Sequence, residues 1–473
     1  MLFNSYAFIF IFLPITLVGY YGLTALGKIK SAKWWLFSAS LYFYTFWTFK
    51  NLPILLLSIA FNYTLGNYLI SQLNEHKKKN ALYLGLAFNI CLLSFFKYSD
   101  QLPFNLNIFL PLGISFFTIQ QIAFIVDSYQ GASEKRSFID YALFVSLFTH
   151  ITAGPITTAQ ALIPQLEATE NKKFNFDKFS LGIFIFCVGL FKKVIIADTF
   201  ATWANEGFSQ SANLEFFGAW KTSLSYSFQL YYDFCGYSEM AMGIGALFNL
   251  NLPQNFNSPF KSKNVIEFWA KWHATLGKFI TTYIFTPIVR QMPSMSFWYI
   301  MLSTFLAMVI VGIWHGAGWT FAIYGALHGL ALVLNHIWKK RKKKLPPFLA
   351  WFLTFNFVNF AFVIFRAANL QEAKHIYKAM MGLQGVTFPK IIIKSVGPLQ
   401  NYGWKMGTYL KPEDYAVLLM TLGAFLVVKY TRNLVEQIKE FEAQPKYALF
   451  SAALFVISLF GLNRVTEFIY LKF

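Results

Sequence analysis

Long apolar stretches alternate with short polar loops along the whole chain. A helix that crosses a lipid bilayer needs about 20 predominantly apolar residues, because the hydrocarbon core is about 30 Å thick. Candidate stretches lie at 5–26, 34–49, 52–72, 80–97, 106–126, 139–158, 180–197, 217–247, 297–314, 318–338, 346–366, 414–431 and 447–463. Several are short or contain polar residues, and non-helical backbone at membrane depth is tolerated only where protein covers it or water reaches it. The pattern therefore predicts an all-α polytopic membrane protein with about 11 to 13 spanning and re-entrant helices.

Basic residues in the connecting loops predict the orientation of the chain. Cytoplasmic loops are enriched in Lys and Arg, and such residues occur at 28–33, 77–79, 135–136 and 339–344. We expect these loops inside, which leaves the N-terminus and the loop 367–413 outside. No Lys or Arg precedes the first apolar stretch, so the basic region of a cleaved signal peptide is missing. The first segment is expected to remain as a membrane helix.

The composition excludes a soluble protein. Of 473 residues, 56% are hydrophobic and 13% are charged, whereas soluble domains carry about 25% charged residues. The net charge of +19 comes from short runs between apolar segments, and no long polar stretch offers the basic face that nucleic acid requires. The three cysteines have no paired spacing, so neither a disulfide framework nor a metal site is expected. We expect one membrane domain over 1–473, with 367–413 as an external loop and 414–473 as a C-terminal pair of spans.

A polar belt at 226–336 interrupts the apolar pattern, and His315 is its strongest candidate for chemistry. Polar residues inside membrane segments are energetically costly and are functional candidates. His315 follows a strongly apolar stretch and stands between Trp314 and Gly316. Glycine allows a ligand to approach closely, and imidazole exchanges a proton near neutral pH. A histidine hydrogen-bonded between helices fits the same spacing, so both interpretations remain open from the residues alone.

Two further histidines of the belt, His273 and His328, are compatible with either a structural or a catalytic role. Trp269 and His273 share one face of an expected amphipathic helix at 264–280, where His273 fits either structural packing or an active site. His328 follows His315 by 13 residues, a rise of about 20 Å on one helix. The two could share a site only if the chain breaks near 316–318, and packing is the favoured role for His328.

Several classes of protein remain as alternatives from the residues alone. No nucleophile elbow, P-loop, Ser-His-Asp order or His-rich metal spacing occurs in the chain. A transporter would use the belt as a midplane site, but it would be expected to have two related halves with broken helices. A membrane sugar transferase would favour a larger external loop than 367–413. A non-catalytic scaffold for an outer partner is also compatible with the pattern.

A series of motifs in a fixed order resembles the membrane-bound O-acyltransferase family, within it the bacterial alginate and peptidoglycan O-acetyltransferase branch. The motifs are Met1-Leu2-Phe3-Asn4-Ser5, Phe12-Leu13-Pro14, Pro111-Leu112-Gly113-Ile114-Ser115-Phe116, Asp127, Ala153-Gly154-Pro155-Ile156, Gly189-Leu190-Phe191-Lys192-Lys193, Asp198, Tyr232-Asp233-Phe234-Cys235-Gly236-Tyr237, Asn255-Phe256, Ser258-Pro259, Phe268-Trp269, Trp272-His273, Trp314-His315-Gly316-Ala317-Gly318-Trp319 and Glu467-Phe468-Ile469-Tyr470. The likeness runs almost from end to end. Each motif alone is weak, and their order makes the resemblance specific.

The resemblance implies a ring of tilted helices around a central tunnel, with His315 as the catalytic histidine and His273 as the second motif histidine. Residues expected to contact the substrates are Trp314, Gly316, Trp319, Tyr232, Asp233 and Trp272. The implied reaction moves an acetyl group from cytoplasmic acetyl-CoA to an outer acceptor, without a bound cofactor or metal. In a related branch the donor is instead a carrier-protein thioester that carries D-alanine.

The resemblance also implies a location and partners. We expect a multi-pass protein of the bacterial inner membrane, surrounded by lipid, that works with an outer O-acetyltransferase or directly on a glycan such as peptidoglycan or alginate. Three positions depart from the family pattern: His150, Thr281-Thr282 and Ile288-Val289-Arg290. The last two lie on the side where the donor would be held.

Overall fold

The computed structural model describes residues 1–99, 109–388, 405–406 and 412–463. The first half contains η1 (Ala7–Phe12), α1 (Leu13–Ala25), α2 (Ile29–Thr45), η2 (Phe49–Asn51), α3 (Leu52–Ser71), α4 (Glu75–Lys97), α5 (Ile114–Tyr129), α6 (Phe138–Ser146), α7 (Ala159–Glu167), η4 (Glu170–Lys172), α8 (Phe176–Phe191), η5 (Lys192–Ala197), α9 (Asp198–Ser209), η6 (Ser211–Asn213) and α10 (Phe216–Leu247). The second half contains η7 (Pro259–Lys261), α11 (Val265–Lys271), α12 (Ala274–Phe279), η8 (Ile280–Phe285), α13 (Thr286–Gln291), α14 (Phe297–His315), α15 (Trp319–Lys340), α16 (Pro347–Arg366), α17 (Leu370–Met380), α19 (Pro412–Tyr430), α20 (Leu434–Lys439) and α21 (Pro445–Gly461). A two-residue parallel pair of strands, β1 (Thr387–Phe388) and β2 (Lys405–Met406), completes the described chain. The predicted all-α fold is confirmed, and the motif at 467–470 lies outside the described residues.

Seven helices in the described chain are long and apolar enough to cross a membrane. They are Ala7–Ala25, Phe49–Ser71, Glu75–Tyr98, Phe176–Ser209, Phe297–His315, Trp319–Lys340 and Pro347–Arg366. Two shorter apolar helices, Tyr415–Tyr430 and Pro445–Gly461, cover the expected C-terminal pair. The protein is therefore a multi-pass membrane protein, as the apolar pattern predicted.

One predicted span, at 139–158, is wrong in its second half. Helix α6 ends at Ser146, and the chain continues through turns until α7 begins at Ala159. Every residue from 147 to 157 is buried, and His150 at the centre of this segment faces the carbonyl oxygen of Phe144 at 2.8 Å through Nε2. The apolar composition predicted a helix, but the surrounding protein covers an irregular segment just as well.

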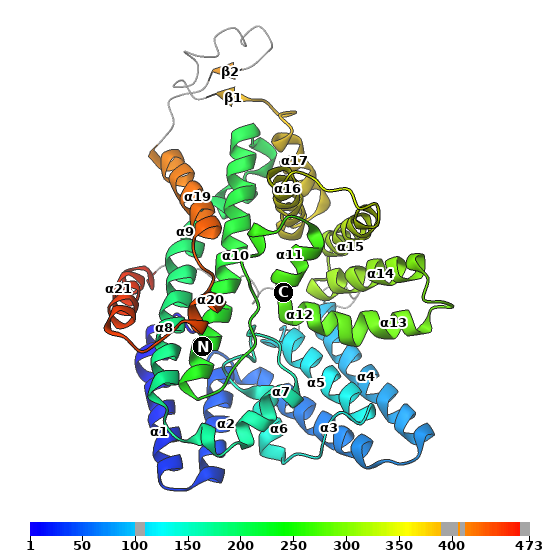
Figure 1. Ribbon diagram of the computed structural model, residues 1–473, viewed down its shortest axis with the longest axis vertical. Coiled ribbons are helices and arrows are strands. Elements are labelled where there is room, and N and C mark those ends of the chain that lie inside the picture. The colour runs from blue at the N-terminus through cyan, green and yellow to red at the C-terminus, as the bar shows by residue number, and fades with distance from the viewer. Residues whose placement is uncertain (100–108, 389–404, 407–411, 464–473) are drawn as a thin grey trace.

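Helix α10 lies along the middle of the molecule, with α8 and α9 on one side and α16 and α17 on the other (Figure 1). Small residues allow α8 and α10 to approach closely, as is common between membrane helices. A Cβ atom on Gly236 would lie 2.6 Å from the carbonyl oxygen of Gly189. Because α10 is buried along most of its length, it forms the wall against which the elements of the polar belt pack.

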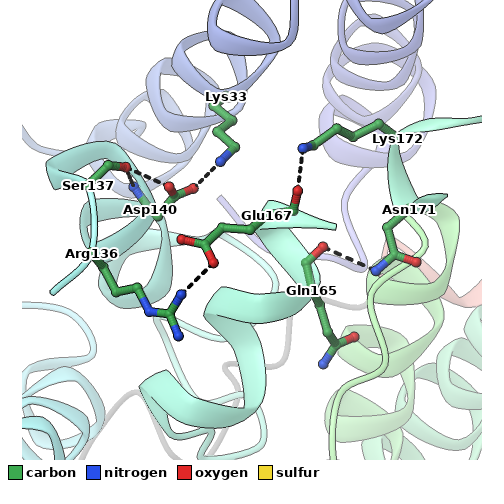
Figure 2. Close-up of polar contacts among 8 residues, drawn as sticks. All are labelled: Lys33, Arg136, Ser137, Asp140, Gln165, Glu167, Asn171 and Lys172. Atoms are coloured by element: carbon green, nitrogen blue, oxygen red, sulfur yellow. Dashed lines mark hydrogen bonds and ion pairs between the residues drawn. The ribbon is translucent and has the colours of Figure 1, made fainter. Parts of the chain in front are cut away.

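Charged and polar groups of α2, α6, α7 and η4 and of the loops beside them lie close together, and we call them the loop network. Figure 2 shows its members, Lys33, Arg136, Ser137, Asp140, Gln165, Glu167, Asn171 and Lys172. Lys33 forms an ion pair with Asp140, which also accepts a hydrogen bond from Ser137 Oγ at 2.5 Å. Arg136 pairs with Glu167 at 2.7 Å, and Lys172 Nζ donates to the Glu167 backbone carbonyl at 2.6 Å. The Lys33–Asp140 pair joins α2 to α6, and the Arg136–Glu167 pair joins the loop before α6 to α7.

Candidate active site in the polar belt

The chain breaks directly after His315, and the break brings two histidines of the belt together. Helix α14 ends at His315 and α15 begins at Trp319, so the two helices form a hairpin instead of one straight helix. The hairpin is tight because a Cβ atom on Gly312 would lie 2.9 Å from the Cα atom of Gly325. The ring of Tyr324 lies 6.4 Å from that of His315 and 4.6 Å from that of His328. The condition under which the two histidines could share a site is therefore met.

The His315 side chain is buried among rings and faces a lysine from a distant helix. Its imidazole lies 4.8 Å from the Trp314 ring and 5.3 Å from the Phe365 ring. Lys97, at the end of α4, donates from Nζ to the Trp314 carbonyl oxygen and lies 5.5 Å over the Trp314 ring. His315 is within electrostatic range of Lys97, His273 and His328. We call these four residues the histidine cluster.

His273 is placed by a break that the sequence analysis did not predict. The expected single helix at 264–280 is wrong, because α11 ends at Lys271, α12 begins at Ala274, and His273 between them has a φ of 44°. This left-handed conformation is costly for a non-glycine residue. It turns the imidazole away from the α11 face and into the interior, where the ring packs 4.7 Å from Phe234.

Asn255 determines which nitrogen of His273 carries the proton. Asn255 Nδ2 donates to Ser238 Oγ at 3.1 Å, and its Oδ1 accepts from Thr275 Oγ1 at 2.5 Å. The same Oδ1 lies 3.2 Å from His273 Nδ1. Because a carbonyl oxygen only accepts, the neutral imidazole carries its proton on Nδ1. Its Nε2 atom is therefore left with a lone pair, as a general base requires.

In His328 the proton is on the other ring nitrogen. Trp269 Nε1 donates to His328 Nδ1 at 3.1 Å, and an indole N–H can only donate. The proton of the neutral His328 ring is therefore on Nε2, which has no hydrogen-bond partner among the described residues. The ring itself is packed against Trp269 at 5.2 Å and Phe357 at 5.1 Å. His328 thus combines the predicted packing role with one N–H donor directed into the interior.

The other predicted substrate contacts are only partly brought together. Gly316 packs beneath Phe321, since a Cβ atom there would lie 2.2 Å from the Phe321 ring. Trp272 is buried and lies 5.1 Å from the Phe256 ring. Trp319, in contrast, is 79% exposed at the start of α15 and lies apart from the buried cluster.

Tyr232 and Asp233 lie on α10, in a region of buried charge. Asp233 pairs with Lys193 at 2.7 Å, and Lys193 also pairs with Asp198 at 2.6 Å. All three side chains are 2% exposed, so a single buried ammonium group bridges two buried carboxylates. Tyr232 is also buried, and its ring lies 4.9 Å from that of Tyr231. This arrangement stabilises the packing of α10 against η5 and α9.

Sequence reasoning missed Lys97, Asn255 and Tyr324 as members of the site. Lys97 stood at the end of an apolar stretch and Asn255 inside a recognised motif, but neither spacing indicates the histidine that it faces. Trp314 Nε1 and Tyr226 Oη are among the buried polar atoms that have no hydrogen-bond partner in the described part of the chain. Buried polar atoms are usually hydrogen-bonded. Trp314 Nε1, whose ring packs against His315, and His328 Nε2 lack such a bond among the described residues, and we take the histidine cluster around them as the candidate active site. The described residues contain no group of three or more His, Cys, Asp or Glu side chains that could hold a metal.

Comparison with known proteins supports the family resemblance of the sequence motifs. The profile of the membrane-bound O-acyltransferase family matches residues 30–370. A peptidoglycan O-acetyltransferase of Helicobacter pylori is 44% identical over 432 residues, which cover 82% of this chain and 81% of that protein. A probable alginate O-acetylase AlgI of Pseudomonas aeruginosa is 36% identical over 80% of this chain and 75% of its own length. A teichoic acid D-alanyltransferase of Bacillus subtilis is 29% identical over 56% of this chain and 70% of its own length.

Proposed function

The chain belongs to the membrane-bound O-acyltransferase family and is an O-acyltransferase, and from this premise we propose that it acetylates a cell-wall glycan, peptidoglycan in preference to alginate. Acetyl-CoA on the cytoplasmic side is the proposed donor, and a hydroxyl outside the inner membrane is the proposed acceptor. The preference for peptidoglycan rests on the 44% identity to a peptidoglycan enzyme, against 36% to an alginate enzyme over a similar share of the chain.

The observation that carries the proposal is the position of the buried His315 at the hairpin break, beside the Trp314 carbonyl that Lys97 binds and across the Tyr324 ring from His328. In the proposed mechanism His315 is the general base, and it accepts the proton of the acceptor hydroxyl from within about 3 Å. The hydroxyl oxygen then attacks the thioester carbonyl, and CoA leaves as the thiol. General bases of this kind contribute about 10²–10⁴-fold to a rate.

The remaining members of the site have proposed supporting roles. Lys97 and the N–H of His328 provide positive charge and a donor where the carbonyl oxygen becomes negative, which is a large contribution to catalysis in a dry site. Trp314, Gly316 and Trp272 form apolar walls that keep water from the thioester. His273, Tyr232 and Asp233 orient the site, and Trp319 is exposed enough to meet an acceptor or an outer partner protein.

D-alanyl transfer from a carrier-protein thioester is the alternative reaction. The D-alanyltransferase relative matches a smaller part of the chain than the acetyltransferases do, which favours acetyl transfer. The proposed topology, with the N-terminus outside, comes from the basic loops. It locates the donor side at the lysine-rich loops and the acceptor side at 367–413.

The test uses purified protein in sealed lipid vesicles with radiolabelled acetyl-CoA outside and peptidoglycan fragments inside, or the reverse. Wild type is compared with His315→Gln, with His76→Gln as a matched control because His76 is exposed in the first turn of α4. Release of free CoA and labelling of the glycan are followed together, and folding is checked by size-exclusion chromatography.

Turnover by wild type and the control, with loss in a folded His315→Gln protein, supports the proposal. Equal turnover by all three proteins would mean that His315 is structural. Labelling only when a D-alanyl carrier protein replaces acetyl-CoA would assign the chain to the other reaction. Labelling that does not require acetyl-CoA on the side of the lysine loops would contradict the proposed direction.

A further inference from the structure

A groove opens on the membrane-facing surface between α15 and α16, beside the start of α11. Its volume is about 870 Å³, within the range of about 300–1,000 Å³ that is typical of ligand sites. Apolar side chains form its walls, among them Val265, Leu327, Leu330, Leu334, Leu353 and Phe357. Both α15 and α16 are long and apolar enough to span a membrane, so the groove is open to the hydrocarbon interior.

The length of the groove matches one leaflet of a bilayer. From Leu327 to Lys339 the helix rises about 18 Å, and half of the hydrocarbon core measures about 15 Å. Trp338 lies at the end of the groove next to Lys339 and is 42% exposed, and tryptophan favours the boundary between hydrocarbon and headgroups. Leu330 and Leu334 are half-exposed along the wall. The groove therefore has the dimensions and surroundings of an acyl-chain site.

Positive charge is concentrated at the same end of the groove. Four lysines line it there, Lys263, Lys339, Lys343 and Lys344, and its lining residues include no Asp or Glu. None of the four forms an ion pair with a carboxylate of the described residues. The neighbouring carboxylate of Glu267 is paired with Lys271 at 2.7 Å.

The adjacent Lys340 provides an internal contrast. Its ammonium group lies 4.6 Å over the Phe297 ring on another helix and is absent from the groove lining. The turn that follows directs the later lysines to the groove, since Lys342 has a φ of 54° and reverses the chain before α16. This conformation is costly for a non-glycine residue. The surrounding structure must therefore stabilise the turn that places Lys343 and Lys344 at the groove.

We propose that this groove binds an anionic phospholipid of the surrounding membrane. One acyl chain would lie between α15 and α16, and the headgroup phosphate would be held by Lys263, Lys339, Lys343 and Lys344. Basic pockets between membrane helices bind anionic headgroups in this way. A membrane lipid fits better than soluble CoA because the wall is open to hydrocarbon along its length. The proposal is independent of the proposed acetyl transfer.

The test measures lipid binding to the full-length protein by native mass spectrometry, with phosphatidylglycerol and phosphatidylcholine of identical chains. The first variant, Lys339→Gln/Lys343→Gln/Lys344→Gln, removes charge. The second, Ala350→Trp, fills the groove without changing charge, since Ala350 lines it. The control, Lys77→Gln/Lys78→Gln/Lys79→Gln, removes the same charge from a basic run outside the groove.

We expect wild type and the control to retain phosphatidylglycerol in preference to phosphatidylcholine. The apparent Kd for phosphatidylglycerol should rise about tenfold or more in the first variant, and Ala350→Trp should abolish retention of the lipid. Equal retention of the two lipids by wild type, or an equal loss in the control, would overturn the proposal. So would unchanged binding to Ala350→Trp. Displacement of the lipid by free CoA would instead identify the groove as part of the donor site.

Discussion

The loop network and the histidine cluster both bury polar groups, but the partners of those groups differ. In the loop network (Figure 2), Asp140, Arg136 and Glu167 each have an opposite charge or a hydroxyl within bonding distance. Around the histidine cluster, aromatic rings provide most of the contacts, and Trp314 Nε1 and His328 Nε2 have no hydrogen-bond partner in the described chain.

This difference has a physical meaning. A buried charge without a partner costs several kcal/mol, so the Lys33–Asp140 and Arg136–Glu167 ion pairs favour the native arrangement of the loops. Buried polar atoms without a partner, such as Trp314 Nε1 and His328 Nε2, cost stability and keep their bonding capacity for other molecules. We therefore expect substitutions in the loop network to change folding stability, and those in the histidine cluster to change turnover at constant stability.

The largest expected effect is that of His315→Gln on turnover. Loss of the general base should lower kcat about 10²–10⁴-fold, measured as CoA release in vesicles. The unfolding temperature in detergent should stay close to that of wild type, because glutamine can pack in the same space beside the rings of Trp314 and Phe365. A large drop in unfolding temperature would mean that His315 has a structural role.

The next effect is that of Asp140→Asn on stability. Lys33 is 14% exposed and Asp140 5%, so removal of the carboxylate leaves a mostly buried ammonium without its partner. We expect the free energy of unfolding to fall by about 2–3 kcal/mol, with an unchanged kcat per folded molecule. Denaturant titration in lipid–detergent micelles measures the change, and Glu206→Gln is the control because Glu206 is exposed. A loss of kcat without a loss of stability would contradict the assignment.

A smaller effect is expected for Asn255→Ala, which removes the acceptor facing His273 Nδ1 at 3.2 Å. Without this acceptor the imidazole can adopt the other tautomer, so kcat should fall about tenfold. KM should change little, and Asn255→Asp should restore most of the rate because it keeps an acceptor. If kcat and KM are the same in Asn255→Ala as in wild type, Asn255 does not position His273.

The smallest effect is that of Arg136→Gln. Arg136 is 25% exposed and its partner Glu167 35%, and ion pairs near the surface contribute only about 0–1 kcal/mol. We expect a loss of about 0.5 kcal/mol in the same titration and no change in turnover. A loss as large as that of Asp140→Asn would mean that the loop network acts as one cooperative unit.

Much of the fold could be predicted because it depends on local composition. Apolar length alone indicated α3, α14, α15 and α16 almost to the residue, since lipid leaves a helix no alternative to internal hydrogen bonding. The segment after Ser146 was mispredicted because local composition was again the only guide. Its residues are as apolar as those of a span, and only the packing of neighbouring helices shows that protein surrounds an irregular path.

The site could be predicted only in part, as the two histidine motifs illustrate. By itself the sequence determined that the chain is a helical membrane protein, that polar residues gather at 226–336, and that His315 stands beside flexible glycines. Tertiary structure alone decided that Lys97 reaches the Trp314 carbonyl, that Asn255 sets the tautomer of His273, and that Trp319 lies outside the cluster. Helix propensity and apolarity act over a few neighbouring residues, whereas these contacts join residues as many as 217 positions apart. They are set by how the helices pack, which no local pattern records.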